Sequence, residues 1–149
     1  ILVDGRPVYA TRQRFPKATK LNVTKPSDIL SVVDIDEQTV VVLMTHNYNY
    51  DLAALQQLVN TNCKYIGVLG PRKKLNKMFD ELKKKGIDIN NEKISNIYGP
   101  VGLDIGAETS EEIALSIIAE IKAVFAKCEG SSLKDKTTEI HNRTSVTNE

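Results

Sequence analysis

The chain has 149 residues, of which 41% are hydrophobic and 26% are charged, a composition that suits one globular domain with a single core. Its 20 basic residues nearly balance its 19 acidic ones, so the net charge of +1 provides no extended positive field for nucleic acid or an anionic membrane. No apolar run approaches the roughly 20 residues that cross a bilayer, and the two cysteines, Cys63 and Cys128, form neither a disulfide framework nor a zinc motif. We therefore expect a cytoplasmic protein with reduced thiols.

The first third of the chain alternates short β-rich runs with breakers. The pattern predicts a strand at residues 1–4, a turn or short helix at 7–14, a weaker strand at 20–23 and a helix at 26–33. Pro26 fits the first turn of that helix, because the proline nitrogen has no proton to leave unpaired.

The middle third continues the same alternation more clearly. Residues 39–44 predict a strand, and their unbroken apolarity is typical of a strand covered on both faces, as in a parallel sheet. Leu52, Leu55 and Val59 recur at helical spacing. Residues 64–69 then predict another strand, and residues 71–85 predict a helix that ends before Gly86.

The last third contains the most clearly signalled helix. Residues 88–98 predict a short helix leading to a final strand near 97–98 or 101–103. Thr109 and Glu112 have the spacing of a capping box, and the helix should end near Lys127. One face of it carries apolar residues at helical spacing: Ile113, Ile117, Ile121 and Phe125. We assign residues 1–128 to the domain and expect residues 129–149 to be a disordered tail, because the tail has no apolar period.

Alternating strands and helices predict an α/β fold with a Rossmann-like, doubly wound parallel sheet. In that fold a GxGxxG loop follows a central first strand, and no such loop occurs in this sequence. The fold is therefore expected to lack the first βα unit, which would leave the runs at 1–4 and 39–44 without the strand between them. A missing segment, another polypeptide or a domain-swapped copy could fill that slot, unless the strand order is unusual.

Ligands bind to doubly wound sheets beyond the carboxyl ends of the strands, and two such ends carry polar groups early in the chain. Asp4 is placed to hydrogen-bond ribose hydroxyls, or only to start a turn, and Arg6 suits a phosphate. Thr45 and His46 follow the strongest strand, and Asp51 lies at the start of the next helix. No second His or Cys lies near His46 in the sequence, so we expect no metal held by protein ligands there.

Two further strand ends are rich in glycine. Gly70 allows a ligand to approach the backbone, and Arg72 opens a helix whose free amides attract an anion. Gly102 and Gly106 flank Asp104 just before the last helix, where side chains would obstruct a ligand. Each signal is weak by itself, and their recurrence at successive strand ends predicts a site along one rim of the sheet.

Three stretches resemble the C-terminal Rossmann domain of the XdhC/CoxI family, the accessory factors of molybdenum hydroxylases such as xanthine dehydrogenase. They are THNYNYDLAAL, YIGVLGPRKK and GPVGLDIGAETSEEIALSIIAEI, in that order, within a similarity that runs from about residue 1 to residue 126. The resemblance implies that the protein binds molybdenum cofactor (molybdopterin), protects it during sulfuration and delivers it to the apo-enzyme, as a maturation factor rather than a catalyst.

The resemblance also implies partners. They are the molybdenum hydroxylase apo-enzyme and a cysteine desulfurase, with self-association into a homo-oligomer. Two other functions stay open from the residues themselves. One is an NAD(P)-binding oxidoreductase fragment, favoured by the α/β pattern and Asp4. The other is an interaction module that has lost cofactor binding.

Overall fold

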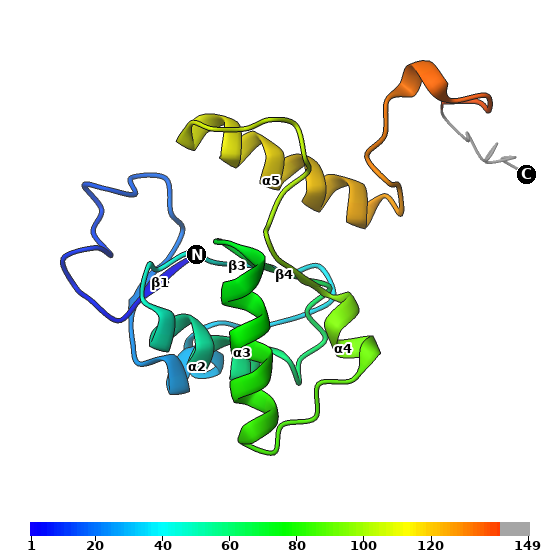
Figure 1. Ribbon diagram of the computed structural model, residues 1–149. Helices are drawn as coiled ribbons and strands as arrows, with labels where there is room; N and C mark the ends of the chain where they lie inside the picture. Colours follow the sequence, from blue (N-terminus) through cyan, green and yellow to red (C-terminus); the bar gives the residue numbers. More distant parts are fainter. Residues whose placement is uncertain (141–149) are drawn as a thin grey trace, which may run out of the picture.

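Short strands alternate with helices along residues 1–140, which are the residues that the computed structural model describes (Figure 1). The strands are β1 (Leu2–Asp4), β2 (Leu21–Val23), β3 (Val40–Leu43), β4 (Tyr65–Val68) and β5 (Ile97–Tyr98). The helices are α1 (Ile29–Val32), α2 (Tyr48–Leu58), α3 (Arg72–Lys84), α4 (Asn91–Ser95) and α5 (Ser110–Phe125). Two 3-10 turns, η1 (Pro26–Asp28) and η2 (Leu133–Asp135), complete the described elements.

All strand pairs are parallel, and they form two separate sheets. β1 pairs with β2, with Val3 opposite Asn22, and β3, β4 and β5 form the second sheet in that order. Within the described residues no backbone ladder joins β1 to β3. The predicted α/β fold with parallel strands is therefore confirmed.

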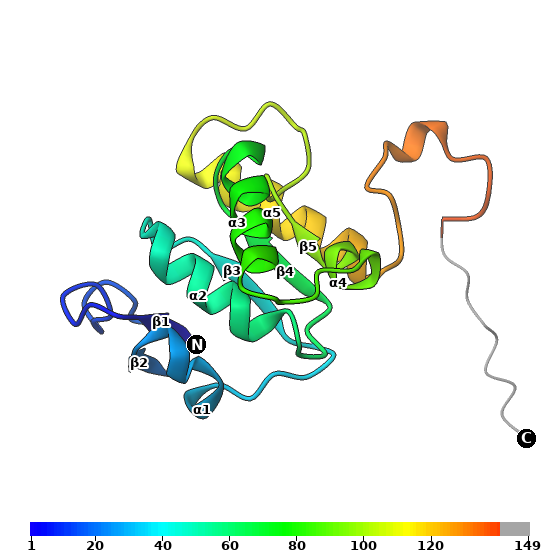
Figure 2. The same ribbon diagram turned by 60° about the horizontal axis from the view of Figure 1, so that its bottom comes forward.

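Helices cover both faces of the larger sheet (Figures 1 and 2). α2 and α3 lie on one face and α5 lies on the other. The first two share a face because successive βαβ crossovers in one direction are right-handed. Their buried faces meet the sheet in the main core. Its members include Leu52, Leu55, Leu58, Ile66, Val68, Leu75, Met78 and Leu82.

The α5 face of the sheet is built on aromatic rings. Tyr65 is fully buried, its ring stacks on Tyr98 with a centroid distance of 4.5 Å, and its hydroxyl donates to Glu120 of α5 over 2.5 Å. Burial and the bond to Glu120 raise the pKa of Tyr65, so the phenol stays protonated and remains a donor. Gly67, the neighbour of these rings, leaves room for Val101, because an added Cβ would press on the Val101 side chain.

The structure refines the predicted boundaries. Residues 7–14 form turns and no helix, and the last strand is at 97–98 rather than 101–103. The capping box of Thr109 and Glu112 is present, with Ile117 buried as predicted. Phe125, predicted on the buried face, is 41% exposed because the last turns of α5 extend past the sheet (Figure 1).

The predicted disordered tail, residues 129–149, lies only partly within the described part of the chain. Residues 129–140 are exposed and contain only the short turn η2, whereas residues 141–149 lie outside the described part of the chain. The predicted disorder of residues 129–149 therefore stays a prediction. Among the described residues, no helix combines the length and apolarity needed to cross a membrane.

Candidate functional site at the carboxyl ends of the strands

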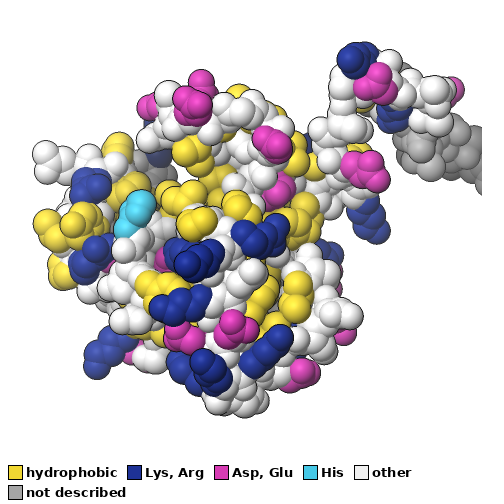
Figure 3. Space-filling model, in the orientation of Figure 1, with side chains coloured by type: hydrophobic (Ala, Val, Ile, Leu, Met, Phe, Trp, Pro, Cys, Tyr) yellow, Lys and Arg dark blue, Asp and Glu magenta, His cyan; other side chains and the backbone are white. Residues whose placement is uncertain are grey.

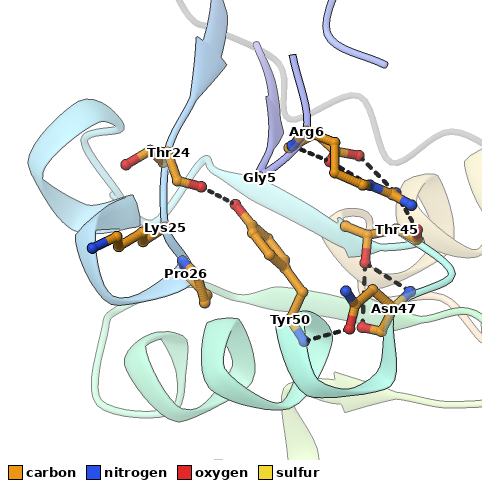
Figure 4. A pocket seen from close by; sticks show the side chains of 9 residues that line it. Gly5, Arg6, Thr24, Lys25, Pro26, Thr45, Asn47 and Tyr50 are labelled. Atoms are coloured by element: carbon orange, nitrogen blue, oxygen red, sulfur yellow. Dashed lines mark hydrogen bonds and ion pairs between the residues drawn. The ribbon is translucent and has the colours of Figure 1, made fainter. Parts of the chain in front are cut away.

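Arg6 bridges the two sheets where β1 and β3 end (Figure 4). Its guanidinium binds both carboxylate oxygens of Asp4, with Nε 3.0 Å from Oδ1 and Nη2 3.1 Å from Oδ2. The same Nη2 donates to the backbone oxygen of Thr45 over 2.7 Å. The centre of the Tyr9 ring lies 4.1 Å from the guanidinium carbon and covers one face of the guanidinium. The sequence-predicted residues Asp4, Arg6 and Thr45 are therefore in one network.

The Asp4 carboxylate is held in its charged form. Burial alone would raise the pKa of Asp4, but the side-chain and backbone hydrogen bonds from Arg6, together with its charge, outweigh burial and lower it below its ordinary value. The Arg6 guanidinium keeps Nη1 free of hydrogen bonds within the described residues, and the side chain is 41% exposed. Arg6 can therefore still present two N–H groups to an anion.

Thr45 is fixed by the helix that follows it. Its hydroxyl donates to Asp51 Oδ1 over 2.6 Å and accepts from the backbone N–H of Asn47 over 3.2 Å. Asn47 in turn caps α2, with its side chain accepting from the backbone N–H of Tyr50. Because the Thr45 proton is committed to Asp51, the hydroxyl meets a ligand as a hydrogen-bond acceptor.

Asp51 is fully buried and is paired with Lys74. Lys74 Nζ lies 2.8 Å from Asp51 Oδ2 and also donates to the carbonyl of Leu69 at the end of β4 over 2.9 Å. Asp51 thus joins the end of β3, through Thr45, to the end of β4, through Lys74. The network from Asp4 to Lys74 is continuous across three strand ends.

A pocket of about 230 Å³ opens beside Arg6 (Figure 4). The ring of Tyr50 forms one wall, and its hydroxyl donates to the carbonyl of Thr24 at the end of β2 over 2.9 Å. Gly5 forms another wall, where an added Cβ would press on the Tyr50 ring. The lining residues are Asp4, Gly5, Arg6, Thr24, Lys25, Pro26, Thr45, Asn47 and Tyr50.

The other predicted site residues near α2 and α3 are His46, which lies in the turn before α2, and Gly70 and Arg72, which lie at the start of α3. His46 has a positive φ of 58° and an exposed side chain in the turn before α2. Gly70, with φ of 125°, lies against the Lys74 side chain. Arg72 is exposed at the first position of α3, and within residues 1–140 its side chain makes no hydrogen bond or salt bridge. Pro71 precedes it without a side-chain cap, so the first amides of α3 stay available.

The loop at 99–109 is hydrogen-bonded to α5, and two of its glycines, Gly102 and Gly106, have different surroundings. Gly102 has φ of 106°, its N–H donates to Glu120 over 2.9 Å, and an added Cβ would collide with Ser116. Packing against α5 is thus a sufficient reason for glycine there. Asp104 and Gly106 are exposed, and nothing lies within 4 Å of a Cβ added to Gly106. The hydrogen-bonded network from Asp4 to Lys74 includes neither of them.

Within the described residues, no group of three or more His, Cys, Asp or Glu side chains is arranged so that it could hold a metal ion. Both cysteines are free, Cys63 buried and Cys128 exposed.

Comparison with known families gives a match over most of the chain. Residues 1–121 match the family model described as the XdhC Rossmann domain. The chain belongs to the XdhC family. The resemblance proposed from the three sequence stretches is confirmed. In this XdhC domain the first and third stretches follow the carboxyl ends of β3 and β5, whereas the second runs through β4 into the start of α3.

Named relatives and a solved structure agree with this assignment. A Bacillus subtilis protein named as a probable xanthine dehydrogenase component is 36% identical over 81% of this chain and 34% of its own length. A molybdenum cofactor insertion chaperone of Escherichia coli, PaoD, is 31% identical over 60% of this chain and 28% of its own. The crystal structure of a xanthine dehydrogenase from Bacillus halodurans superposes with a TM-score of 0.71 at 30% identity, covering 84% of this chain and 36% of that one. The XdhC chain thus spans about a third of each of these three proteins.

Three polar residues that hold the site or its neighbouring loop, Lys74, Ser116 and Glu120, are not predicted from the sequence. Lys74 reads as one of several surface lysines on α3, yet its side chain is only 20% exposed and neutralises Asp51. No local signal singles out Lys74, because Arg72 and Lys73 are cations in the same first turn of α3. Glu120 and Ser116, which hold the 99–109 loop, lie within an apolar helix and give no local signal of that role.

Proposed function

We propose that this XdhC domain binds molybdenum cofactor at the rim of its sheet and assists the insertion of that cofactor into an apo-enzyme of the xanthine dehydrogenase type. The observation that carries the proposal is the family match over residues 1–121, which contains the whole polar network from Asp4 to Lys74. The names of the relatives from Bacillus subtilis and Escherichia coli support the same function.

The residues at the rim fit the chemistry of the cofactor. Molybdopterin is a pterin that carries a phosphate, so it needs one anion site and several hydrogen-bonding groups for its ring. Arg72 and the free amides at the start of α3 would hold the phosphate. Thr45 would accept a hydrogen bond from a ring N–H, and Arg6 would donate through Nη1. The bound group supplies redox chemistry only after delivery to its enzyme.

The proposal includes the partners that the family resemblance implies. They are the molybdenum hydroxylase apo-enzyme, a cysteine desulfurase that sulfurates the cofactor, and a second copy of the chain. We place this activity in the cytoplasm, and two free cysteines are consistent with a reducing compartment.

An NAD(P)-dependent activity is less well supported by the geometry. A ribose would have to share the Asp4 carboxylate with Arg6, which already occupies both oxygens. Saturable NADH binding at micromolar concentration, followed by fluorescence, would favour that activity instead. An interaction module without a cofactor would bind a molybdenum hydroxylase while retaining no pterin.

The proposed function is tested by cofactor retention. Purified chain is mixed with molybdenum cofactor released from a molybdoenzyme, passed through gel filtration, and assayed for the fluorescence of the oxidised pterin. Thr45→Val and Arg72→Met should each reduce retention about tenfold, since each removes a hydrogen bond or charge contact worth over about 1 kcal/mol.

Lys64→Met is the matched control, because Lys64 is an exposed lysine that precedes β4 at the opposite end of the sheet and pairs with Glu37. Its retention should equal that of the unmodified chain. A chain that retains no pterin, or rim variants that retain as much as the control, would contradict the proposal.

A further inference from the structure

The outward side of α3 carries more positive charge than any other helix of the described chain. Residues 72–85 contain seven basic and two acidic side chains, whereas the whole chain has a net charge of only +1. Figure 3 shows Lys and Arg side chains gathered over this helix. We call the six exposed ones the basic face of α3: Arg72, Lys73, Lys77, Lys83, Lys84 and Lys85.

The cations near the start of α3 work against the helix itself. Arg72 and Lys73 lie in its first turn, where the helix dipole disfavours positive charge. Lys73 and Lys77 are like charges four residues apart, a spacing at which they repel each other. The lysines at 83–85 differ, because the dipole favours cations in the last turn. Helix stability therefore explains the lysines at the end of α3 and not the cations at its start.

Neighbouring side chains do not neutralise these cations. Within residues 1–140, no salt bridge involves Arg72 or Lys73, and Lys77 lies 3.9 Å from Glu81, at the outer limit of an ion pair. The neighbouring helix α2 has one charged side chain, Asp51, which is buried and paired with Lys74. Charges that a fold does not use for its own stability are typical of functional surfaces.

Lys77 is held in a fixed position by an aromatic ring. Its ammonium lies 4.7 Å from the centre of the Tyr48 ring, and the Tyr48 hydroxyl donates to Glu81 over 2.9 Å. Burial and the bond to Glu81 raise the pKa of Tyr48 to about 12, so the phenol keeps the proton that it donates. The charge of Lys77 is therefore presented to solvent from a rigid support.

The composition of the basic face favours an acidic protein surface over other anions. Surfaces that bind nucleic acid combine basic residues with aromatic or arginine side chains that stack on bases, and this face has a single arginine. A helix that binds membranes exposes an apolar flank, but Leu75, Met78 and Leu82 of α3 are buried. Asp80, exposed among the lysines, would also repel closely spaced phosphates.

We propose that the basic face of α3 docks an acidic surface of the apo-enzyme during cofactor delivery, an inference that rests on the proposed function. α3 begins at the rim with Arg72, and Lys77 lies only about 8 Å further along the helix axis. An enzyme bound to this face would therefore lie beside the cofactor site. Charge attraction of this kind speeds association and is weakened by salt, which suits a complex that forms and separates repeatedly.

A second copy of the chain is the weaker candidate for the acidic surface. The stretch at 104–112 carries four carboxylates, those of Asp104, Glu108, Glu111 and Glu112. Glu112 is already committed, because it accepts from the N–H groups of Glu108 and Thr109. Contact between this stretch and the basic face joins unlike surfaces, so it leads to a ring or a filament. Such an assembly would cover the face that delivery requires.

The test measures association of the whole chain with a xanthine dehydrogenase purified without its cofactor. Lys73→Gln/Lys77→Gln removes two charges of the basic face and keeps good helix formers. Lys122→Gln/Lys134→Gln is the matched control, because it removes two exposed charges from α5 and η2. At about 50 mM salt the association rate should fall about tenfold in the first variant and stay unchanged in the control, and at about 300 mM salt the difference should shrink to about twofold.

Pterin retention by the same variants separates this inference from the proposed function. Lys73→Gln/Lys77→Gln keeps Arg72, so its retention should stay within about twofold of the unmodified chain. An unmodified chain that retains no pterin contradicts the proposed function, whereas normal retention with equal association rates in the two double variants overturns the docking surface alone. No binding of the apo-enzyme would also overturn it. So would a dimer that is lost in Lys73→Gln/Lys77→Gln, or tighter binding to an RNA oligonucleotide or to phosphatidylglycerol vesicles than to the apo-enzyme.

Discussion

Lys74 is the partner of a carboxylate that has no access to water. Asp51 is 0% exposed and receives hydrogen bonds from Lys74, from the Thr45 hydroxyl and from the Thr45 N–H. Removing one member of a buried ion pair leaves the other charge uncompensated, which costs far more than the pair itself contributes.

The variant Lys74→Met should therefore lower the free energy of unfolding by about 3–5 kcal/mol. Lys77→Met is the matched control, because Lys77 is 66% exposed and lies 3.9 Å from Glu81 on the same helix, where such a pair contributes about 0–1 kcal/mol. Urea denaturation followed by circular dichroism measures both. Equal losses in the two variants would show that Lys74 does not neutralise a buried charge.

Arg6 determines the direction in which the pKa of Asp4 moves. The folded-state pKa lies below the ordinary 3.8, so the pair stabilises the fold above that pH and the stabilisation is lost as pH falls through the folded pKa. Arg6→Met removes the guanidinium bonds and their charge while burial remains, so the pKa of Asp4 should rise. A carboxyl-carbon NMR titration of Asp4 measures both values, and an identical Asp4 midpoint in the two chains would refute this cause.

At the scale of elements, the loop at 99–109 behaves as an extension of α5. Glu120 accepts from the Gly102 N–H, and Ser116 donates its hydroxyl to the Leu103 carbonyl over 2.6 Å. Tyr65 of β4 donates to the same Glu120 carboxylate, so strand, loop and helix are tied at one side chain. This arrangement positions Asp104 and Gly106 relative to the sheet.

Two glycine substitutions separate packing from backbone strain in that loop. Gly102→Ala should cost about 3 kcal/mol, because a Cβ would meet Ser116 and the φ of 106° is unfavourable to alanine. Gly106→Ala has φ of 71° and open space around the added Cβ, so it should cost only about 1 kcal/mol. Thermal unfolding of both variants gives the comparison, and a Gly106→Ala loss as large as that of Gly102→Ala would contradict it.

Sequence patterns predict those elements whose signals are local. The capping box of Thr109 and Glu112 and the apolar run at 39–44 give α5 and β3 to within about two residues. Residues 7–14 turn out to be turns, because they carry no apolar face that a helix there would bury. Phe125 is exposed although its spacing is correct, because helical periodicity does not reveal where the sheet beneath it ends.

At the scale of the whole molecule, the sequence predicts which residues lie at the rim but not which hydrogen bonds connect them. Strand ends converge in a parallel sheet, so Asp4, Arg6, Thr45 and Asp51 could be grouped from topology. The bonds of Arg6 to Asp4 and Thr45, and of Lys74 to Asp51, depend on side-chain directions that no spacing encodes. The gap between β1 and β3 could be inferred from the sequence, because the glycine loop that follows the central strand of a doubly wound sheet does not occur in it.

The proposed location of molybdopterin at the rim can be mapped by amide chemical shifts, measured while molybdopterin is added to the labelled chain. We predict shifts at Gly5 and Arg6, at residues 45–47 and at residues 70–72, with residues 61–64 at the opposite ends of the strands unchanged. Shifts concentrated at residues 61–64, with the rim unaffected, would contradict the account.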